Sequence, residues 1–150
     1  MRIGTQFSIF LVNKPGVLAQ VTSALAKARV NVHALTLVDS SEHGVLRIVC
    51  ADLEAARKAL GKTHDQFTET EVLVLEITNE PGAFAAAAQK LADAHININY
   101  AYCTGGAPGG KTTAIFKVAD LKKALRALKP AKGPRKDRPE TVKKSPRRRR

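Results

Sequence analysis

The feature that most constrains this chain is a stretch that occurs twice. The segment from Asn13 to His33 begins Asn-Lys-Pro-Gly, continues with apolar residues three and four apart, and ends Val-Asn-Val-His. The segment that begins at Asn79 repeats this order as Asn-Glu-Pro-Gly, a second periodic run and Ile-Asn-Ile-Asn, 66 residues further on (79 − 13 = 66). A repeat of this length predicts a chain built from two copies of one small unit.

The first copy has the pattern of alternating strands and helices. Residues 6–12 are rich in Phe, Ile, Leu and Val and precede a turn, which indicates a buried strand. Pro15 is tolerated in the first turn of a helix, and the apolar residues after it have the spacing of a one-faced helix. Strand-like residues 30–38 and 45–50 follow, and then a helix that Asp52 would cap.

Residues 65–78 are strand-like throughout, which exceeds the usual strand length of about three to ten residues. We therefore expect the last strand of the first unit to run directly into the first strand of the second. The second unit then repeats the order helix, strand, strand, helix, with Asp120 as the last cap. The predicted fold class is α+β, with two tandem ferredoxin-like (βαββαβ) units packed side by side and their helices on a common face.

The second unit lacks a clear fourth strand, because the residues from Lys129 onward are mainly Pro, Lys and Arg. This would leave one sheet edge open, and an open edge is often covered by a partner chain. A homodimer is therefore one expectation for the assembled protein.

The basic charge of the chain is concentrated at its end. The formal net charge is +12, and residues 129–150 hold eleven Lys or Arg against two acidic residues, which accounts for +9 of it. We expect a first unit at 1–71, a second unit at 72–128 and a disordered basic tail at 129–150, because proline and dense like charge leave nothing to bury. Such a tail could bind nucleic acid weakly and without sequence preference, which leaves a nucleic-acid-associated protein as one alternative function.

Nothing in the sequence resembles a signal peptide, and no apolar run approaches the ~20 residues of a membrane span. Cys50 and Cys103 lie far apart and have no local pairing motif. We therefore expect a reducing cytoplasm as the location and no membrane partner.

One motif match does not have the structural context that its chemistry needs. Residues 105–112, Gly-Gly-Ala-Pro-Gly-Gly-Lys-Thr, fit the phosphate-loop pattern at every position. That loop needs a helix that begins at its Lys-Thr, so that the positive end of the helix faces the phosphates. Residues 113–118 are strand-like instead, so we expect a flexible hairpin loop and no nucleotide cofactor.

The titratable side chains do not suggest catalysis. His43, His64 and His95 have no partners at metal-ligand spacing, and neither cysteine has a basic neighbour, so we expect no metal site. No nucleophile has an activating base, so we expect no enzyme. His33, at a strand edge beside Asn31, is kept as a possible ligand contact.

The repeated turns are the best candidate for a ligand site. In each copy an asparagine lies in the turn before the helix, and a glycine three residues later lets another group approach the unpaired N–H donors of the helix start. Such a corner favours a carboxylate, and a second asparagine opens the next strand. One such turn could be ordinary turn chemistry, but both asparagines recur in both copies. The candidate ligand-binding residues are Asn13, Gly16, Asn31, Asn79, Gly82 and Asn97.

These motifs, with Leu or Phe two residues after each turn glycine, resemble the ACT domain, a small ligand-sensing module attached to many enzymes of amino-acid metabolism. The resemblance covers residues 6–128 in two copies, and the whole chain resembles stand-alone tandem ACT proteins. It implies allosteric regulation without catalysis, an amino acid effector bound where two modules meet, and an enzyme of amino-acid metabolism as a possible partner. It pairs Asn13 and Gly16 with Asn97, and Asn79 and Gly82 with Asn31. A further alternative is an interaction module that has lost its ligand.

Overall fold

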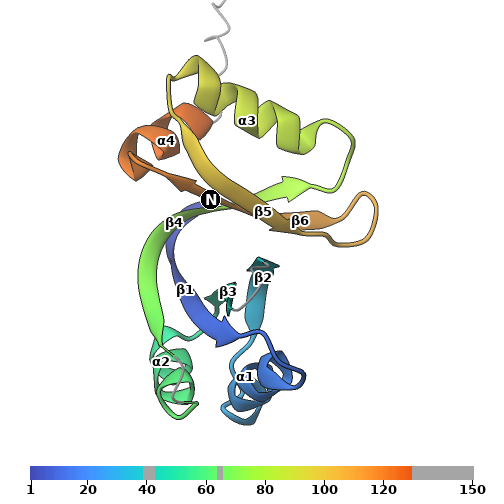
Figure 1. The fold of residues 1–150 in the computed structure, drawn as a ribbon. Coiled ribbons are helices and arrows are strands. Elements are labelled where there is room, and N and C mark those ends of the chain that lie inside the picture. Colours follow the sequence, from blue (N-terminus) through green and yellow to red (C-terminus); the bar gives the residue numbers. More distant parts are fainter. Residues whose placement is uncertain (39–42, 64–65, 130–150) are drawn as a thin grey trace, which may run out of the picture.

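The computed structural model describes residues 1–38, 43–63 and 66–129 and consists of four helices and six strands in one sheet (Figure 1). The predicted basic tail lies outside these residues, apart from Lys129. No helix in the described ranges is long and apolar enough to span a membrane. The elements in chain order are β1 (Arg2–Val12), α1 (Val17–Lys27), β2 (Val32–Val38), β3 (His43–Cys50), α2 (Leu53–Gly61), β4 (Phe67–Thr78), α3 (Ala83–Asp93), β5 (Ile98–Thr104), β6 (Lys111–Val118) and α4 (Leu121–Leu128).

The sheet has the strand order β2-β3-β1-β4-β6-β5, and every neighbouring pair is antiparallel. Strand β3 separates β1 from β2, and β6 separates β4 from β5 in the same way, so each half contains a split βαβ arrangement. The chain is thus α+β, and its two halves repeat one topology.

Strand β4 belongs to both halves. Its residues Phe67–Val74 pair with β1, and its residues Leu73–Thr78 pair with β6. The strand is twelve residues long and has no break, which confirms the prediction of one continuous strand in this region.

The edge expected to be open in the second half is partly covered. The start of β1 occupies the place of a fourth strand there, because Arg2 pairs with Val74 and Ile3 pairs with Leu73. The sequence reasoning missed this contact because it began the first strand at residue 6. Beyond Val74, the described pairing of β4 is with β6 alone.

Both helix pairs cover the same face of the sheet. Phe67 of β4 packs under α1 and α2, and Leu73 of the same strand packs under α3 and α4. Side chains alternate between the two faces of a strand, so two residues six positions apart lie on the same face. The sheet curls so strongly that the two helix pairs lie at opposite ends of the molecule (Figure 1). The helix-free face consequently folds on itself and forms a third core. This core contains Ala34, Val49, Val72, Val74 and Ile115, with Tyr102 packed against it.

A buried polar network ties the two halves together beside this third core. Gln6 is fully buried on β1, and its Nε2 donates to Ser8 Oγ at 3.0 Å and to Tyr100 Oη at 2.8 Å. The hydroxyl of Tyr102 donates to Gln6 Oε1 at 3.1 Å, and the Arg47 guanidinium lies 4.4 Å from the centre of the Tyr100 ring. Strand β1 of the first half is therefore bonded to β5 of the second across the helix-free face.

Candidate functional site

The two repeated turns have the same backbone geometry. Gly16 precedes α1 with φ 89° and ψ −17°, and Gly82 precedes α3 with φ 87° and ψ −14°. A Cβ at either position would meet nothing within 4 Å, so the need for glycine comes from the left-handed conformation and not from crowding. The retained conformation shows that the repeat extends to the backbone of the candidate site.

The helices that follow these turns begin without a side-chain cap, and neither has an acidic residue in its first turn. The other two helices differ, because Asp52 accepts from Ala55 N at 3.0 Å and Asp120 accepts from Lys123 N at 2.8 Å. The uncapped starts of α1 and α3 therefore keep N–H donors and the positive end of the helix dipole available to an anion.

Asn13 is exposed and lines a cavity of about 360 Å³ at the end of β1. The wall of this cavity is mainly apolar and includes Leu18, Leu37 and Val38. Lys14 supplies the charged group among its described lining residues. The cavity thus combines an apolar surface with an amide and an ammonium beside an uncapped helix start.

Asn79, the counterpart of Asn13, has a different environment. Its Nδ2 donates to the carbonyl oxygens of Gly106 at 2.7 Å and Ala107 at 3.2 Å, in the loop between β5 and β6. Its backbone N–H donates to Gly110 O, and its carbonyl accepts from Gly109 N. In the second unit the turn is therefore fastened to the glycine-rich loop, a contact that sequence reasoning missed.

The same loop contains the residues that match the phosphate-loop pattern. Residues 105–110 connect two antiparallel strands, and Lys111 opens β6 instead of a helix. A Cβ at Gly106 would clash with Lys111 O, and Gly109 has φ 73°. The glycines thus serve a tight loop, and the prediction of a hairpin in place of a strand-to-helix loop is confirmed.

The register of the strands separates the predicted pairs of site residues within one chain. Asn97 directly precedes Ile98. When the strand registers are followed from β5 through β6 and β4 to β1, Ile98 lies at the same height in the sheet as Thr5. Asn13 lies eight residues further along β1 (13 − 5 = 8), or about 26 Å at roughly 3.3 Å per residue. The cavity beside Asn13 is accordingly lined by residues of the first half alone.

The other pair is separated in the same way. Asn31 precedes Val32, which lies near the level of Glu71 on β4, and Asn79 is eight residues beyond Glu71 (79 − 71 = 8). Asn31 and Asn97 are both exposed, each just before its strand. The structure therefore leaves Asn13, Asn31 and Asn97 exposed, with Asn79 half-buried, and does not bring the predicted pairs together within a single chain.

His33 lies at the junction of the two halves. It lines a cavity of about 330 Å³ with Arg2, Glu76 and Thr113 among its neighbours. The pKa of Glu76 is lowered, chiefly by its bond to Lys111, whose Nζ lies 3.1 Å from Glu76 Oε2. Sequence reasoning singled out His33 but not the charged residues that share this cavity.

The two cysteines have different environments. Cys50 is buried, and burial raises its pKa to about 11, so it remains a thiol at neutral pH. Cys103 is exposed, and both cysteines are free. No group of three or more His, Cys, Asp or Glu side chains that could hold a metal occurs in residues 1–38, 43–63 and 66–129.

Known structures and families share this architecture. The chain is similar to protein BT0572 from Bacteroides thetaiotaomicron, with 31% identity, a TM-score of 0.76, and coverage of 85% of this chain and 87% of that chain. It shares its fold with the regulatory subunit of aspartate kinase from Thermus thermophilus in its ligand-free form (18% identity, TM-score 0.64, 84% and 92% covered). The corresponding subunit from Thermus flavus has 20% identity, a TM-score of 0.54 and the same coverage.

A comparison with curated proteins gives no match. A family model described as an ACT domain pair matches residues 1–129, which contain both repeated turns and every described helix and strand. The chain therefore belongs to the family of ACT domain pairs.

Proposed function

We propose that this protein is a regulator without catalytic activity that binds an amino acid at the interface of two ACT units. The observation that carries the proposal is the repeated turn, in which a left-handed glycine precedes an uncapped helix beside an asparagine. Two of the similar structures are regulatory subunits of aspartate kinase, and we extend this role to control of an enzyme of amino-acid metabolism by this chain.

The chemistry of the half-sites suits a zwitterion. The helix starts near Gly16 and Gly82 offer N–H donors to a carboxylate, and the amide oxygens of Asn31 and Asn97 can accept from an ammonium group. In this arrangement Asn79 holds its turn against the loop between β5 and β6, and Asn13 lies exposed beside the donors of its own turn. A ligand that carries both charges needs both halves of such a site.

A complete site would require a second chain. The two halves of each predicted site are separated by about 26 Å in the direction of the strands. A homodimer is therefore needed to bring the turn of one chain next to the strand start of another. Large apolar side chains are exposed around the Asn13 turn, and burial by a second chain would remove them from water. These side chains are Val12, Leu18, Leu37 and Val38.

The proposal assigns residues 1–71 and 72–128 to the two units, with the boundary inside the shared strand β4. Residues 129–150, whose sequence is strongly basic, are assigned to neither unit. We place the protein in the cytoplasm, and the free state of Cys50 and Cys103 supports this location.

A thermal-shift screen of the full chain against each of the twenty amino acids tests the function. A ligand at 100 times its dissociation constant adds about 2.7 kcal/mol to the free energy of unfolding, which raises the melting temperature measurably. If no amino acid shifts the melting temperature at millimolar concentration, the alternative of an interaction module without a ligand is favoured.

Calorimetry on asparagine variants then tests the site. Loss of one hydrogen bond to a charged ligand group is expected to weaken binding by about 1.5–3 kcal/mol, or roughly 10- to 150-fold. Asn13→Ala and Asn97→Ala should affect one class of site, and Asn79→Ala and Asn31→Ala the other. Unchanged affinity and stoichiometry in all four variants would place the site elsewhere.

A further inference from the structure

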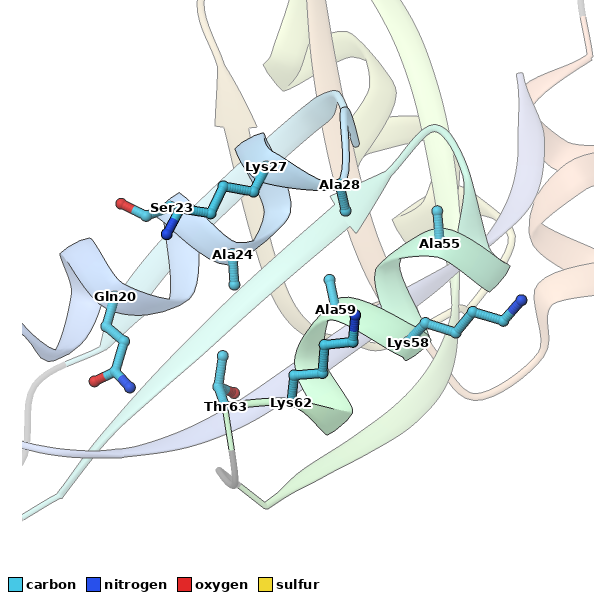
Figure 2. Close-up of a pocket in the computed structure, with 10 residues that line it drawn as sticks. All are labelled: Gln20, Ser23, Ala24, Lys27, Ala28, Ala55, Lys58, Ala59, Lys62 and Thr63. Atoms are coloured by element: carbon cyan, nitrogen blue, oxygen red, sulfur yellow. The ribbon is translucent and has the colours of Figure 1, made fainter.

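A second concave surface lies between α1 and α2, and it shares no lining residue with the cavity beside Asn13. It is a groove of about 650 Å³, and Figure 2 shows alanines of the two helices facing each other across it with lysines around them. Small side chains at these positions let another chain approach the helix backbones closely. The floor consists of Ala24, Ala28, Ala55 and Ala59, and the charged residues around it are Lys27, Lys58 and Lys62.

The charge on this groove is positive and not compensated. Its lining contains three lysines and no carboxylate, and none of the three lysines forms an ion pair in the described part of the chain. The nearby carboxylates of Glu54 and Glu69 both accept from Arg57, which donates two bonds to Glu69 at 2.7 and 2.8 Å. The groove therefore offers three ammonium groups to a partner.

The second unit shows that this groove does not follow from the fold alone. Helix α3 follows α1 at an offset of 66 residues, so Lys90 occupies the position that Ala24 has in the first unit. Helix α4 follows α2 at an offset of 68 (120 − 52 = 68), so Lys123 occupies the position of Ala55. Asp93 stands at the end of α3, where α1 ends with a lysine. Two of the four floor alanines recur in the second unit, as Ala94 and Ala127, but the complete alanine floor and the uniformly positive rim occur in the first unit alone among the described residues.

Charge limits what can occupy the groove. The chain's own residues 129–150 carry +9 and would be repelled. The same helix face of a second copy would bring like charges together as well. The remaining occupant is a partner that combines carboxylates with small or apolar side chains.

We propose that the groove between α1 and α2 docks an acidic amphipathic helix of a partner protein. Its apolar face lies on the alanine floor, and its carboxylates reach Lys27, Lys58 and Lys62. Helix α1 has eleven residues and is about 16 Å long, enough to contact two to three turns of a docked helix. This surface is separate from the proposed amino acid site, so the two can be tested independently.

The probe is a synthetic helical peptide with glutamates along one face and alanine and leucine along the other, labelled for fluorescence anisotropy. It should bind the full chain more tightly than a scrambled peptide of the same composition. The triple variant Lys27→Glu, Lys58→Glu, Lys62→Glu should weaken binding about tenfold or more, because each exposed charge pair contributes a fraction of a kcal/mol and reversal makes it repulsive. Since these lysines are at the surface of the groove, the fold should be retained, which circular dichroism checks.

A matched triple in the second unit separates the groove from general electrostatics. The variant Lys90→Glu, Lys123→Glu, Arg126→Glu changes the net charge by the same amount and should leave peptide binding unchanged, although the basic tail is present in both proteins. Equal weakening by both triples, or binding no tighter than the scrambled peptide, overturns the proposal.

The shape of the floor gives a second test that does not alter charge. Ala24→Leu fills the groove at a position where the second unit carries the larger Lys90, so the helix should accept the change. It should weaken peptide binding several-fold, whereas Ala86→Leu on the exposed surface of α3 should not. Unchanged binding by the Ala24→Leu variant means that the peptide does not occupy the floor and overturns the proposal.

Discussion

Removal of one hydroxyl at the junction of the two units should destabilise the whole protein. Gln6 is fully buried, and its Oε1 accepts from the hydroxyl of Tyr102. Tyr102→Phe leaves this buried oxygen without its described donor, which costs about 1–3 kcal/mol. Tyr100→Phe should cost less, about 0.5–1.5 kcal/mol, because Gln6 Nε2 keeps its bond to Ser8.

Urea unfolding of the full chain at pH 7 measures these differences as shifts of the midpoint at constant slope. Gln6→Leu replaces the amide with an apolar group, and its combination with Tyr102→Phe removes both partners. The double variant should therefore be destabilised by less than the sum of the two single variants. Strict additivity, or a Tyr102→Phe variant within about 0.3 kcal/mol of the parent, would refute the role given to this bond.

The Tyr102→Phe variant should also change the pH dependence of the free energy of unfolding. Burial raises the pKa of Tyr102 above the ordinary tyrosine value of about 10. The folded chain keeps the proton while the unfolded chain releases it, so this contribution is fully present below pH ~10 and is lost as the pH rises above it. The stability difference between the parent and Tyr102→Phe should consequently shrink above pH ~10. A difference that stays constant up to pH ~11 contradicts the burial argument.

Three further outcomes are expected. Arg29 and His95 end α1 and α3 with φ 56° and 53°, so replacing either with glycine should raise the free energy of unfolding by up to about 1 kcal/mol in thermal melts. A thiol reagent should modify the exposed Cys103 rapidly, and should modify the buried Cys50 only as fast as the chain unfolds, as mass spectrometry of quenched samples can show. Asn79→Ala should lower stability by about 0.5–1.5 kcal/mol in calorimetric melts, because its amide holds the loop between β5 and β6.

Local sequence signals were sufficient for most of the elements. The caps at Asp52 and Asp120 predict the starts of α2 and α4, since a carboxylate satisfies a free N–H of the helix wherever the rest of the chain lies. The apolar periodicity of the repeat likewise predicts α1 and α3, and the unbroken strand-like run predicts β4. These signals act within a few residues, so they can be read from the sequence.

The missed features all depend on distant contacts. Residues 2–5 have no strand pattern of their own, and they are extended because β4 offers them a partner from Glu71 to Val74. Tyr102 was not singled out, because only the curl of the sheet brings β5 over Gln6. The attachment of Asn79 to the glycine-rich loop similarly needs the pairing of β5 and β6, which no local pattern encodes.

The junction determines how a ligand could act on this protein. A unit of about 66 residues buries only ~60% of the surface that its unfolded chain exposes, so neither half has much stability of its own. Separation of the halves would break the pairing of β4 with β1, expose the third core and open the Gln6 network. Opening and closing of the two units is therefore a costly motion. If an amino acid binds between two chains as proposed, its binding shifts the equilibrium between separate and associated chains more readily than the arrangement of the two units within a chain. The interface between chains can form and separate without unfolding either unit.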